Sequence, residues 1–320
     1  MSLLLRQSFW GFLFATVVIT NGCALEAIVP PPSTDDLSVF LSDLLLHPRQ
    51  SCESLRKIFD VEYLPLVDTP DQAGFNYEEH WVSASDGTQL CVWYLPGDLD
   101  RGAVLVSLGA AGCMPCYLFH AQLLTHDGWS VVLYDYRGYG GSGGQPDIAA
   151  LPDDLEAVLD WTRDYTQRKR VTLMGVSLGT MPSVAVAARR PDAVNGVVLD
   201  SPLALGVLVG RYGSVLGGLA PELVEQLAPQ TVSEDLVSAV RQPLLIFEGE
   251  KDRVTPPSSV QIIYERAAGP KQLVSFPGLG HARAPFRDTG TYLYYLESFL
   301  STIWGQDVEL AVERRAEQSE

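Results

Sequence analysis

Short apolar runs alternate with longer amphipathic stretches along most of the chain. The apolar runs, which we expect to form strands, occupy residues 103–108, 130–135, 171–174, 196–200, 243–248 and 272–276. Stretches with helical spacing of apolar positions lie between them, at residues 116–126, 152–166, 178–190, 257–268 and 289–304. Strands that are apolar throughout and separated by helices are typical of a parallel sheet covered on both faces. The pattern therefore predicts an α/β fold.

Two regions depart from this alternation. Strand-like runs at 77–84 and 89–95 are separated by the turn Asp86-Gly87, which predicts an antiparallel hairpin ahead of the parallel strands. Residues 203–231 are rich in Leu, Val and Gly and follow an expected strand, so they predict a helical insertion. Two interpretations of this insertion stay open, namely a small cap over a site and a helix that packs on the sheet.

The N-terminus has the pattern of an export signal. Arg6 is the one charge in the first 23 residues, and residues 9–19 are almost purely apolar. That length is typical of the apolar region of a signal peptide and is too short to span a bilayer. A small residue, Gly22, then precedes Cys23, which resembles the lipobox of bacterial lipoproteins. In that family the cysteine receives diacylglycerol and becomes the mature N-terminus.

The resemblance implies a lipid-anchored protein of the bacterial cell envelope. Because Ala24 rather than Asp follows the cysteine, it implies an outer-membrane lipoprotein that faces the periplasm. An ordinary cleaved signal and an uncleaved anchor are the alternatives. We therefore expect a signal peptide over 1–22, a Pro-rich linker and amphipathic helical lead-in over 23–74, one α/β domain over 75–304, and a charged tail over 305–320.

Composition and charge narrow the class of function. The chain has 320 residues, of which 47% are hydrophobic and 19% charged, and this balance excludes a mostly disordered protein. Its 22 Lys and Arg against 39 Asp and Glu give a formal net charge of −17. Such a charge repels phosphate backbones, so we expect no nucleic-acid partner.

Cysteines beyond Cys23 allow disulfides in an oxidising compartment. They are Cys52, Cys91, Cys113 and Cys116, for which one or two bonds and three complete pairings are possible. The nearest pair in sequence, Cys113 and Cys116, suggests a local disulfide or two small buried thiols. Because no second Cys pair or adjacent His pair accompanies it, we expect no metal site.

A candidate nucleophile lies at a predicted strand-to-helix turn. Residues 175–179 read GVSLG, directly after the expected strand 171–174 and at the start of an expected helix. A serine that projects from such a sharp turn occupies a strained backbone conformation, and glycines on either side let the turn approach its neighbours. The helix N-terminus behind it offers free N–H groups to a developing oxyanion. We therefore take Ser177 as the candidate nucleophile.

The candidate acid and base follow later strands. Asp252 comes just after an apolar run, where a carboxylate can orient an imidazole, and Asp200 at the end of the preceding run is the rival acid. His281 follows the last run in a Gly-rich loop, PGLGH. The chain order Ser177, Asp252, His281, each after a strand, is the order of one well-known type of hydrolase triad.

Two further motifs make the resemblance specific. Residues 135–144 read DYRGYGGSGG, which resembles a D-x-R-G-x-G-x-S loop, and residues 200–202 read DSP, which resembles an acidic-Ser-Pro motif after the sixth strand. Both motifs belong to α/β-hydrolases, in the branch of serine aminopeptidase-like hydrolases, monoacylglycerol lipases and ABHD-type esterases. The resemblance covers about residues 75–304 and implies a mostly parallel central sheet with helices on both faces and a small cap insertion.

The resemblance also implies a mechanism. Ser177 would be the nucleophile, His281 the base and Asp252 the acid, with the backbone N–H groups of Ala110 and Leu178 as the oxyanion hole. Leu108 stands where the family's usual His-Gly loop begins, and the 135–144 loop is expected to be structural. The implied activity is hydrolysis of a small carboxylic ester or thioester, a class that includes lipid-like esters, without a cofactor. A catalytically silent envelope binding protein and a serine peptidase are the alternatives.

Overall fold

The computed structural model describes residues 46, 52–53, 67–97, 101–212 and 228–305. The expected signal peptide, Cys23, most of the lead-in, part of the expected cap and the tail after Gly305 lie outside the described residues. Among the helices of the described part, none is long and apolar enough to cross a bilayer.

One mixed sheet forms the centre of the described molecule. Its strands are β1 (Glu78–Ser83), β2 (Gln89–Leu95), β3 (Ala103–Ser107), β4 (Ser130–Tyr134), β5 (Val171–Val176), β6 (Val194–Asp200), β7 (Leu244–Gly249) and β8 (Lys271–Phe276). Within the described residues these eight strands are ordered β1-β2-β4-β3-β5-β6-β7-β8. β2 is antiparallel to both β1 and β4, and all other neighbouring pairs are parallel. The predicted hairpin and mostly parallel sheet are confirmed.

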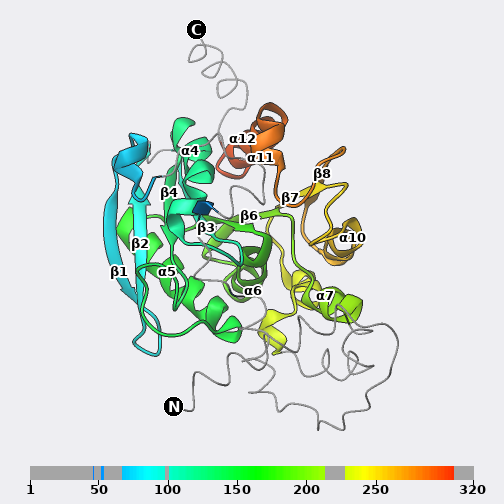
Figure 1. The fold of residues 1–320 in the computed structure, drawn as a ribbon, viewed down its shortest axis with the longest axis horizontal. Helices are drawn as coiled ribbons and strands as arrows, with labels where there is room; N and C mark the ends of the chain where they lie inside the picture. The colour runs from blue at the N-terminus through cyan, green and yellow to red at the C-terminus, as the bar shows by residue number, and fades with distance from the viewer. Residues whose placement is uncertain (1–45, 47–51, 54–66, 98–100, 213–227, 306–320) are drawn as a thin grey trace.

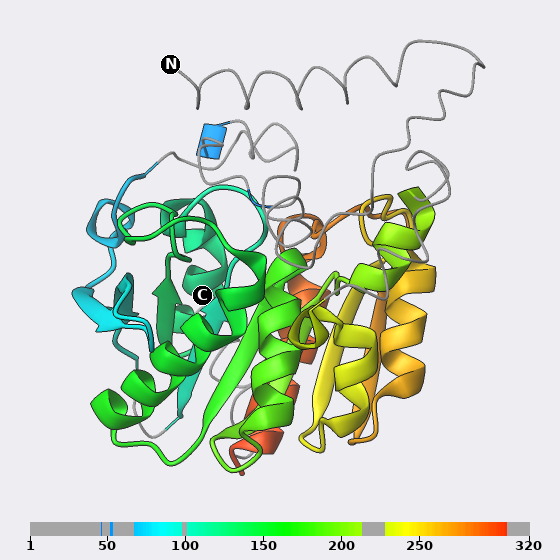
Figure 2. The same cartoon turned by 90° about the horizontal axis from the view of Figure 1, so that it is seen from below.

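Helices cover both faces of the sheet. The α-helices are α4 (Leu118–His126), α5 (Leu151–Thr166), α6 (Thr180–Arg189), α7 (Leu205–Tyr212), α9 (Ser233–Leu236), α10 (Pro257–Arg266), α11 (Ala284–Arg287) and α12 (Thr289–Ile303). Short 3-10 turns are η1 (Pro70–Ala73), η2 (Met114–Tyr117), η3 (Ile148–Ala150), η4 (Ser177–Gly179), η5 (Pro229–Thr231) and η6 (Val237–Ala239). α4 and α12 lie on one side of the sheet and α5 and α6 on the other (Figure 1), and Figure 2 looks onto the latter side.

The sequence pattern explains this layering. Every residue of β3, β4 and β5 is buried, because helices cover both faces of these central strands. The edge strand β1 is mostly exposed. α5 begins with a proline near its first turn and with Asp153 and Asp154, which suit a helix N-terminus, and it buries one stripe that includes Leu151, Leu155 and Leu159.

The strand order places the site. The order in which successive strands are added to the sheet reverses around β3, which pairs in parallel with β4 on one side and with β5 on the other. In open α/β sheets, ligands bind beyond the carboxyl ends of the strands at such a reversal. The loops that follow β3 and β5 carry residues 108–112 and Ser177, so both candidate elements lie at this point of the sheet.

A disulfide joins Cys52 to Cys116, which lies in η2 just before α4. This pairing differs from both interpretations of the Cys113-Cys116 pair, because Cys116 bonds a cysteine 64 positions away. Cys113 and the buried Cys91 remain thiols. The sulfur atoms of Cys52, Cys113 and Cys116 all lie within 4.8 Å of one another. Cys116 therefore has two cysteines nearby in space, and the nearer of them in sequence, Cys113, is not its partner.

Candidate active site

Ser177 lies at the sharp turn between β5 and α6. Its φ of 52° falls in the left-handed region, which a non-glycine residue adopts at a cost in free energy. The turn continues as η4 into α6, and the Thr180 hydroxyl donates to the Ser177 carbonyl at 2.6 Å. The backbone therefore holds the serine at the tip of the turn, as the sequence predicts.

Glycines at both ends of this turn are required by close backbone contacts. A Cβ on Gly175 would lie 2.4 Å from the Gly179 carbonyl oxygen. A Cβ on Gly179 would lie 2.2 Å from the Ser107 carbonyl oxygen at the end of β3. Neither distance is sterically possible, so the two glycines allow the turn to close and to contact the neighbouring strand.

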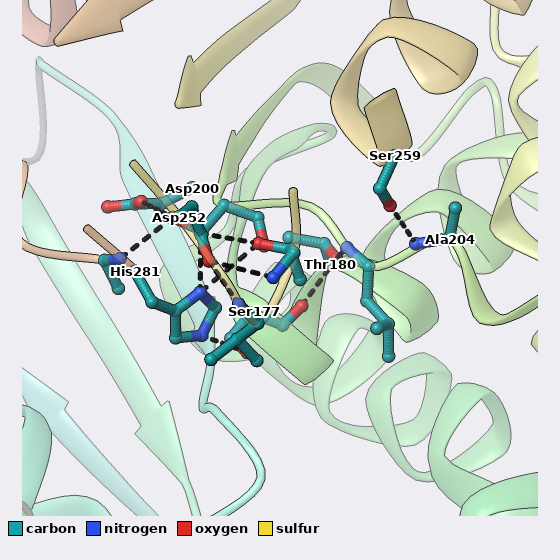
Figure 3. Close-up of polar contacts among 12 residues, drawn as sticks. Ser177, Thr180, Asp200, Ala204, Asp252, Ser259 and His281 are labelled. Carbon is teal, nitrogen blue, oxygen red and sulfur yellow. Dashed lines mark hydrogen bonds and ion pairs between the residues drawn. The ribbon is translucent and has the colours of Figure 1, made fainter. Parts of the chain in front are cut away.

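His281 lies between Ser177 and Asp252 (Figure 3). Its Nε2 atom is 2.8 Å from the Ser177 hydroxyl oxygen, and its Nδ1 atom is 2.7 Å from a carboxylate oxygen of Asp252. The side chain of His281 is 14% exposed and that of Asp252 only 2%. A hydroxyl, an imidazole and a carboxylate in this sequence of hydrogen bonds can transfer a proton from the hydroxyl to the imidazole.

Asp252 is held as an anion by its neighbours. The backbone N–H groups of Val254 and Thr255 donate to one carboxylate oxygen at 2.8 and 2.9 Å, and the Thr255 hydroxyl lies 2.8 Å from the other. Burial alone would raise the pKa of Asp252, but the hydrogen bond and positive charge of His281, together with Thr255, lower it below its ordinary value. The carboxylate is therefore available to accept from His281.

Asp200, the rival acid, has different partners. Its carboxylate accepts hydrogen bonds from the Tyr292 hydroxyl at 3.0 Å and the Ser201 hydroxyl at 3.1 Å. Its complete burial raises its pKa to about 6, although both hydrogen bonds act in the opposite direction. Ser201, with a φ of 53°, accepts from the Ala282 N–H at 3.0 Å. Asp200 thus supports the segment next to His281.

The candidate oxyanion residues lie on either side of the serine turn. Leu178 follows Ser177 in η4, where backbone N–H groups at a helix start lack intrahelical partners. Ala110 belongs to the loop Leu108–Gly112, which follows β3. A Cβ on Gly179 would also lie 2.5 Å from the Leu108 carbonyl oxygen, so this loop begins in direct contact with the serine turn.

Sequence reasoning missed several supporting residues. Thr255 lies 3.2 Å from Nδ1 of His281 through its hydroxyl oxygen, in addition to its bonds with Asp252. Ser201 is part of the DSP motif at residues 200–202, and Tyr292 lies in α12, far along the chain. Their hydroxyl groups carry no periodic signal, so the only available clue was the short distance in sequence between Thr255 and Asp252.

Comparison with known proteins defines the family. Residues 109–236 match the family described as alpha/beta hydrolase fold. The uncharacterized protein Rv2307c of Mycobacterium tuberculosis is 32% identical over 224 residues, which cover 69% of this chain and 78% of that protein. The alpha/beta hydrolase domain-containing protein 17B of Homo sapiens is 31% identical over 188 residues, or 57% of this chain and 60% of that protein.

Solved structures agree on the architecture. The Pyrococcus furiosus esterase Pf2001 superimposes with a TM-score of 0.63 at 19% identity, covering 81% of this chain and 98% of that one. At this level of identity the likeness shows the fold, and function has to be argued from the site. On the sequence match, the relatives and the sheet topology together, the chain belongs to the α/β-hydrolase fold family.

Proposed function

We propose that this protein is a serine hydrolase that cleaves carboxylic esters through an acyl-enzyme intermediate. The observation that carries the proposal is the position of His281, which bridges the Ser177 hydroxyl at 2.8 Å and the Asp252 carboxylate at 2.7 Å. These three side chains come from turns after three different strands, and the bonds among them match the arrangement that activates a serine hydroxyl.

Each residue has a defined role in the proposed reaction. His281 takes the proton of Ser177 as the serine oxygen forms a bond to the acyl carbon. Asp252 keeps the proton of His281 on Nδ1 and stabilises the imidazolium. The imidazolium then protonates the departing alcohol or thiol as its bond to the acyl carbon breaks. A water molecule then gives a proton to His281 as its oxygen forms a bond to the acyl carbon. The bond between the acyl carbon and the Ser177 oxygen breaks, His281 returns the proton to Ser177, and the carboxylic acid leaves.

The backbone N–H groups of Ala110 and Leu178 are the proposed oxyanion hole. Their positions beside the serine turn support this role, since the loop after β3 contacts Gly179. Donors of this kind stabilise the negative charge that develops on the carbonyl oxygen, and the loss of one typically costs about 3–4 kcal/mol in the transition state. The proposed chemistry uses side chains and backbone amides alone.

The proposed substrate class is a small acyl ester or thioester. α7 begins shortly after β6, at the same edge of the sheet as Ser177, and it carries apolar residues. Its start is attached to the domain, because the Ala204 N–H donates to Ser259 at 3.1 Å and the Gly206 N–H to Glu234 at 2.7 Å (Figure 3 shows the former). An apolar helix in this place supports a ligand with an acyl chain. The likeness to ABHD-type esterases points to the same class.

Covalent labelling tests the proposal directly. A fluorophosphonate probe should label the wild-type protein on Ser177, and Ser177→Ala should abolish labelling. Ser238→Ala is the matched control, because Ser238 is an exposed serine whose hydroxyl donates to the Asp235 carbonyl, and it should label like the wild type. A panel of chromogenic esters and thioesters graded by acyl length, with an aminoacyl anilide for peptidase activity, then defines the substrate. A folded wild-type protein that neither labels nor turns over any substrate would favour a silent binding protein.

We also propose that the protein is exported and anchored by a lipid on Cys23, with its hydrolase domain over 75–304. The signal-like pattern of residues 9–19 supports export, and so does the Cys52–Cys116 bond, since disulfides persist mainly in oxidising compartments. Metabolic labelling with an alkynyl fatty acid in a bacterial host should mark the wild-type chain but not Cys23→Ser. Equal labelling of the two would rule out this anchor.

A further inference from the structure

Tyrosine hydroxyl groups hold the loop that carries Ala110. This loop, residues 108–112, lies between β3 and η2 and belongs to no strand or helix, although Ala111 forms an isolated bridge. Several of its carbonyl oxygens accept a hydrogen bond from a phenol. The bonds run from Tyr136 to Leu108 (2.6 Å), from Tyr139 to Ala110 (2.8 Å) and from Tyr117 to Ala111 (3.0 Å).

The tyrosines themselves are rigidly placed. Tyr136 and Tyr139 are 0% exposed and Tyr117 is 5% exposed. Tyr136 and Tyr139 belong to the 135–144 loop, and their rings meet edge to face with centroids 5.5 Å apart. Burial raises the pKa of Tyr117 and holds the pKa of Tyr136 well above its ordinary value, so both phenols keep the proton that they donate.

Asp135 connects the 135–144 loop to η2, which begins just after the 108–112 loop. One oxygen of its buried carboxylate accepts from the Met114 N–H at 2.8 Å, and the other accepts from the Gly141 N–H at 3.0 Å. The 135–144 loop therefore contacts the Leu108–Gly112 loop through the tyrosine hydroxyls and contacts η2, just beyond that loop, through Asp135.

These bonds restrain the peptide that presents the Ala110 N–H. That peptide joins Gly109 to Ala110, and the peptides on both sides of it have their carbonyl oxygens bonded to tyrosines. A peptide plane between two fixed planes has little freedom to rotate. Restraint matters here because glycine is the most flexible residue. A side chain could not supply it at Gly109, since a Cβ there would lie 2.5 Å from the Tyr117 hydroxyl.

We propose that Tyr136, Tyr139 and Tyr117 are positioning residues that hold the Ala110 N–H toward the developing oxyanion. The proposal rests on the proposed function, because it assigns the loop to that reaction. Leucine at position 108 offers the loop no side-chain hydrogen bond, and the three phenols bond the carbonyl oxygens of the loop instead.

Tyr139→Phe is the most selective test, because it removes one hydroxyl and leaves the ring in place. Complete loss of one oxyanion donor lowers kcat by about 10²–10³. A misdirected donor should cost less, so we expect kcat to fall about tenfold while KM changes less than about twofold. A trifluoromethyl ketone, whose tetrahedral adduct places an oxyanion in the same position, should bind more weakly by the same factor.

Tyr94→Phe is the matched control. Tyr94 is also buried, at 5% exposed, but it lies in β2 and its hydroxyl contacts the side chain of Ser130 at 3.4 Å rather than a carbonyl of the 108–112 loop. It should therefore retain the kcat and ketone affinity of the wild type. Equal losses in Tyr94→Phe and Tyr139→Phe, or a folded Tyr139→Phe with wild-type kcat, would overturn the proposal.

Hydrogen exchange separates this proposal from the proposed function. Amides of residues 109–112 should exchange faster in Tyr139→Phe than in the wild type and in Tyr94→Phe, whether or not any ester is cleaved. Unchanged exchange in this segment would overturn the positioning role even in an active enzyme. An inactive wild-type protein would refute the ester hydrolysis itself and with it the catalytic meaning of the loop.

Discussion

Asp200 ends β6 and Asp252 lies just beyond the neighbouring strand β7, so both carboxylates lie at the same edge of the sheet, and both are almost fully buried. Their partners differ. Asp252 accepts from backbone N–H groups and contacts His281, whereas Asp200 accepts from the neutral hydroxyls of Tyr292 and Ser201. As a result the pKa of Asp252 lies below its ordinary value, and burial raises that of Asp200 to about 6.

This difference shows that position after a strand does not decide the role of a carboxylate. A carboxylate with backbone donors and an imidazole remains charged and can stabilise an imidazolium. A carboxylate whose pKa burial raises to about 6 carries its charge less readily and is better suited to structural hydrogen bonds. The comparison therefore predicts that Asp252 acts in the reaction and that Asp200 acts on the stability of the fold around it.

The largest expected effect separates the two carboxylates by activity. Asp252→Asn should lower kcat by about 10⁴, because the amide cannot stabilise the imidazolium and favours the wrong tautomer. Asp200→Asn should lower kcat by less than about tenfold, because asparagine can still accept from Tyr292. Ester turnover by the two variants, each checked by circular dichroism, measures the ratio. Similar losses in both variants would break the comparison.

Stability against pH should distinguish Asp200 in a second way. Its pKa is about 6 in the folded protein against 3.8 as its reference value, so between these values the folded state binds the extra proton. Wild-type stability should therefore fall as pH rises from about 4 to 6, by about 3 kcal/mol from this group. Asp200→Asn should lack this contribution. Urea unfolding at pH 4.5 and pH 7 would show it, and parallel profiles for wild type and variant would contradict it.

His120 should contribute an opposite slope in the same pH range. This side chain is buried in α4, both ring nitrogens lack hydrogen-bond partners in the described structure, and burial lowers its pKa to about 4 from 6.5. The unfolded chain binds the proton first, so stability should fall as pH drops from 6.5 to 4, by about 3 kcal/mol at most. His120→Leu should remove this acid sensitivity in urea unfolding. A variant as acid-sensitive as the wild type would count against it.

The smallest effect should come from the hydroxyl of Thr255. Thr255→Val keeps the shape of the side chain but removes the oxygen that lies 2.8 Å from Asp252. The loss of one such bond is worth about 1 kcal/mol, or about fivefold in kcat. Because Thr255 helps to lower the pKa of Asp252, the acid limb of the pH–rate profile should also shift upward. Thr255→Ser should restore both quantities, and a profile that does not move in Thr255→Val would assign Thr255 to packing alone.

The alternation of apolar runs was sufficient to predict the sheet, because each buried strand and each amphipathic helix leaves a local signal. The same signal located Ser177, Asp252 and His281 at strand ends, where the topology of a parallel sheet brings such residues to one edge. The structure then places their side chains within hydrogen-bonding distance.

Tertiary contacts between distant segments leave no such local signal in the sequence. The 135–144 motif was visible, but nothing local showed that the hydroxyls of Tyr136 and Tyr139 reach a loop that follows another strand. Likewise, the choice between Asp252 and Asp200 depends on which carboxylate the His281 ring meets. The partner of Cys116 depends on where the chain before β1 packs. Each of these outcomes is set by three-dimensional proximity, which sequence spacing does not encode.

The Cys52–Cys116 bond has a consequence for how the protein matures. It closes a covalent ring over a sequence separation of 64 residues, which includes β1, β2, β3 and the Leu108–Gly112 loop. Closing a ring of this length lowers the entropy of the unfolded chain by the equivalent of about 4 kcal/mol. A chain synthesised in a reducing cytosol would lack that contribution beside the 108–112 loop. Recombinant production through an oxidising secretory route is therefore the way to obtain the fully stabilised protein.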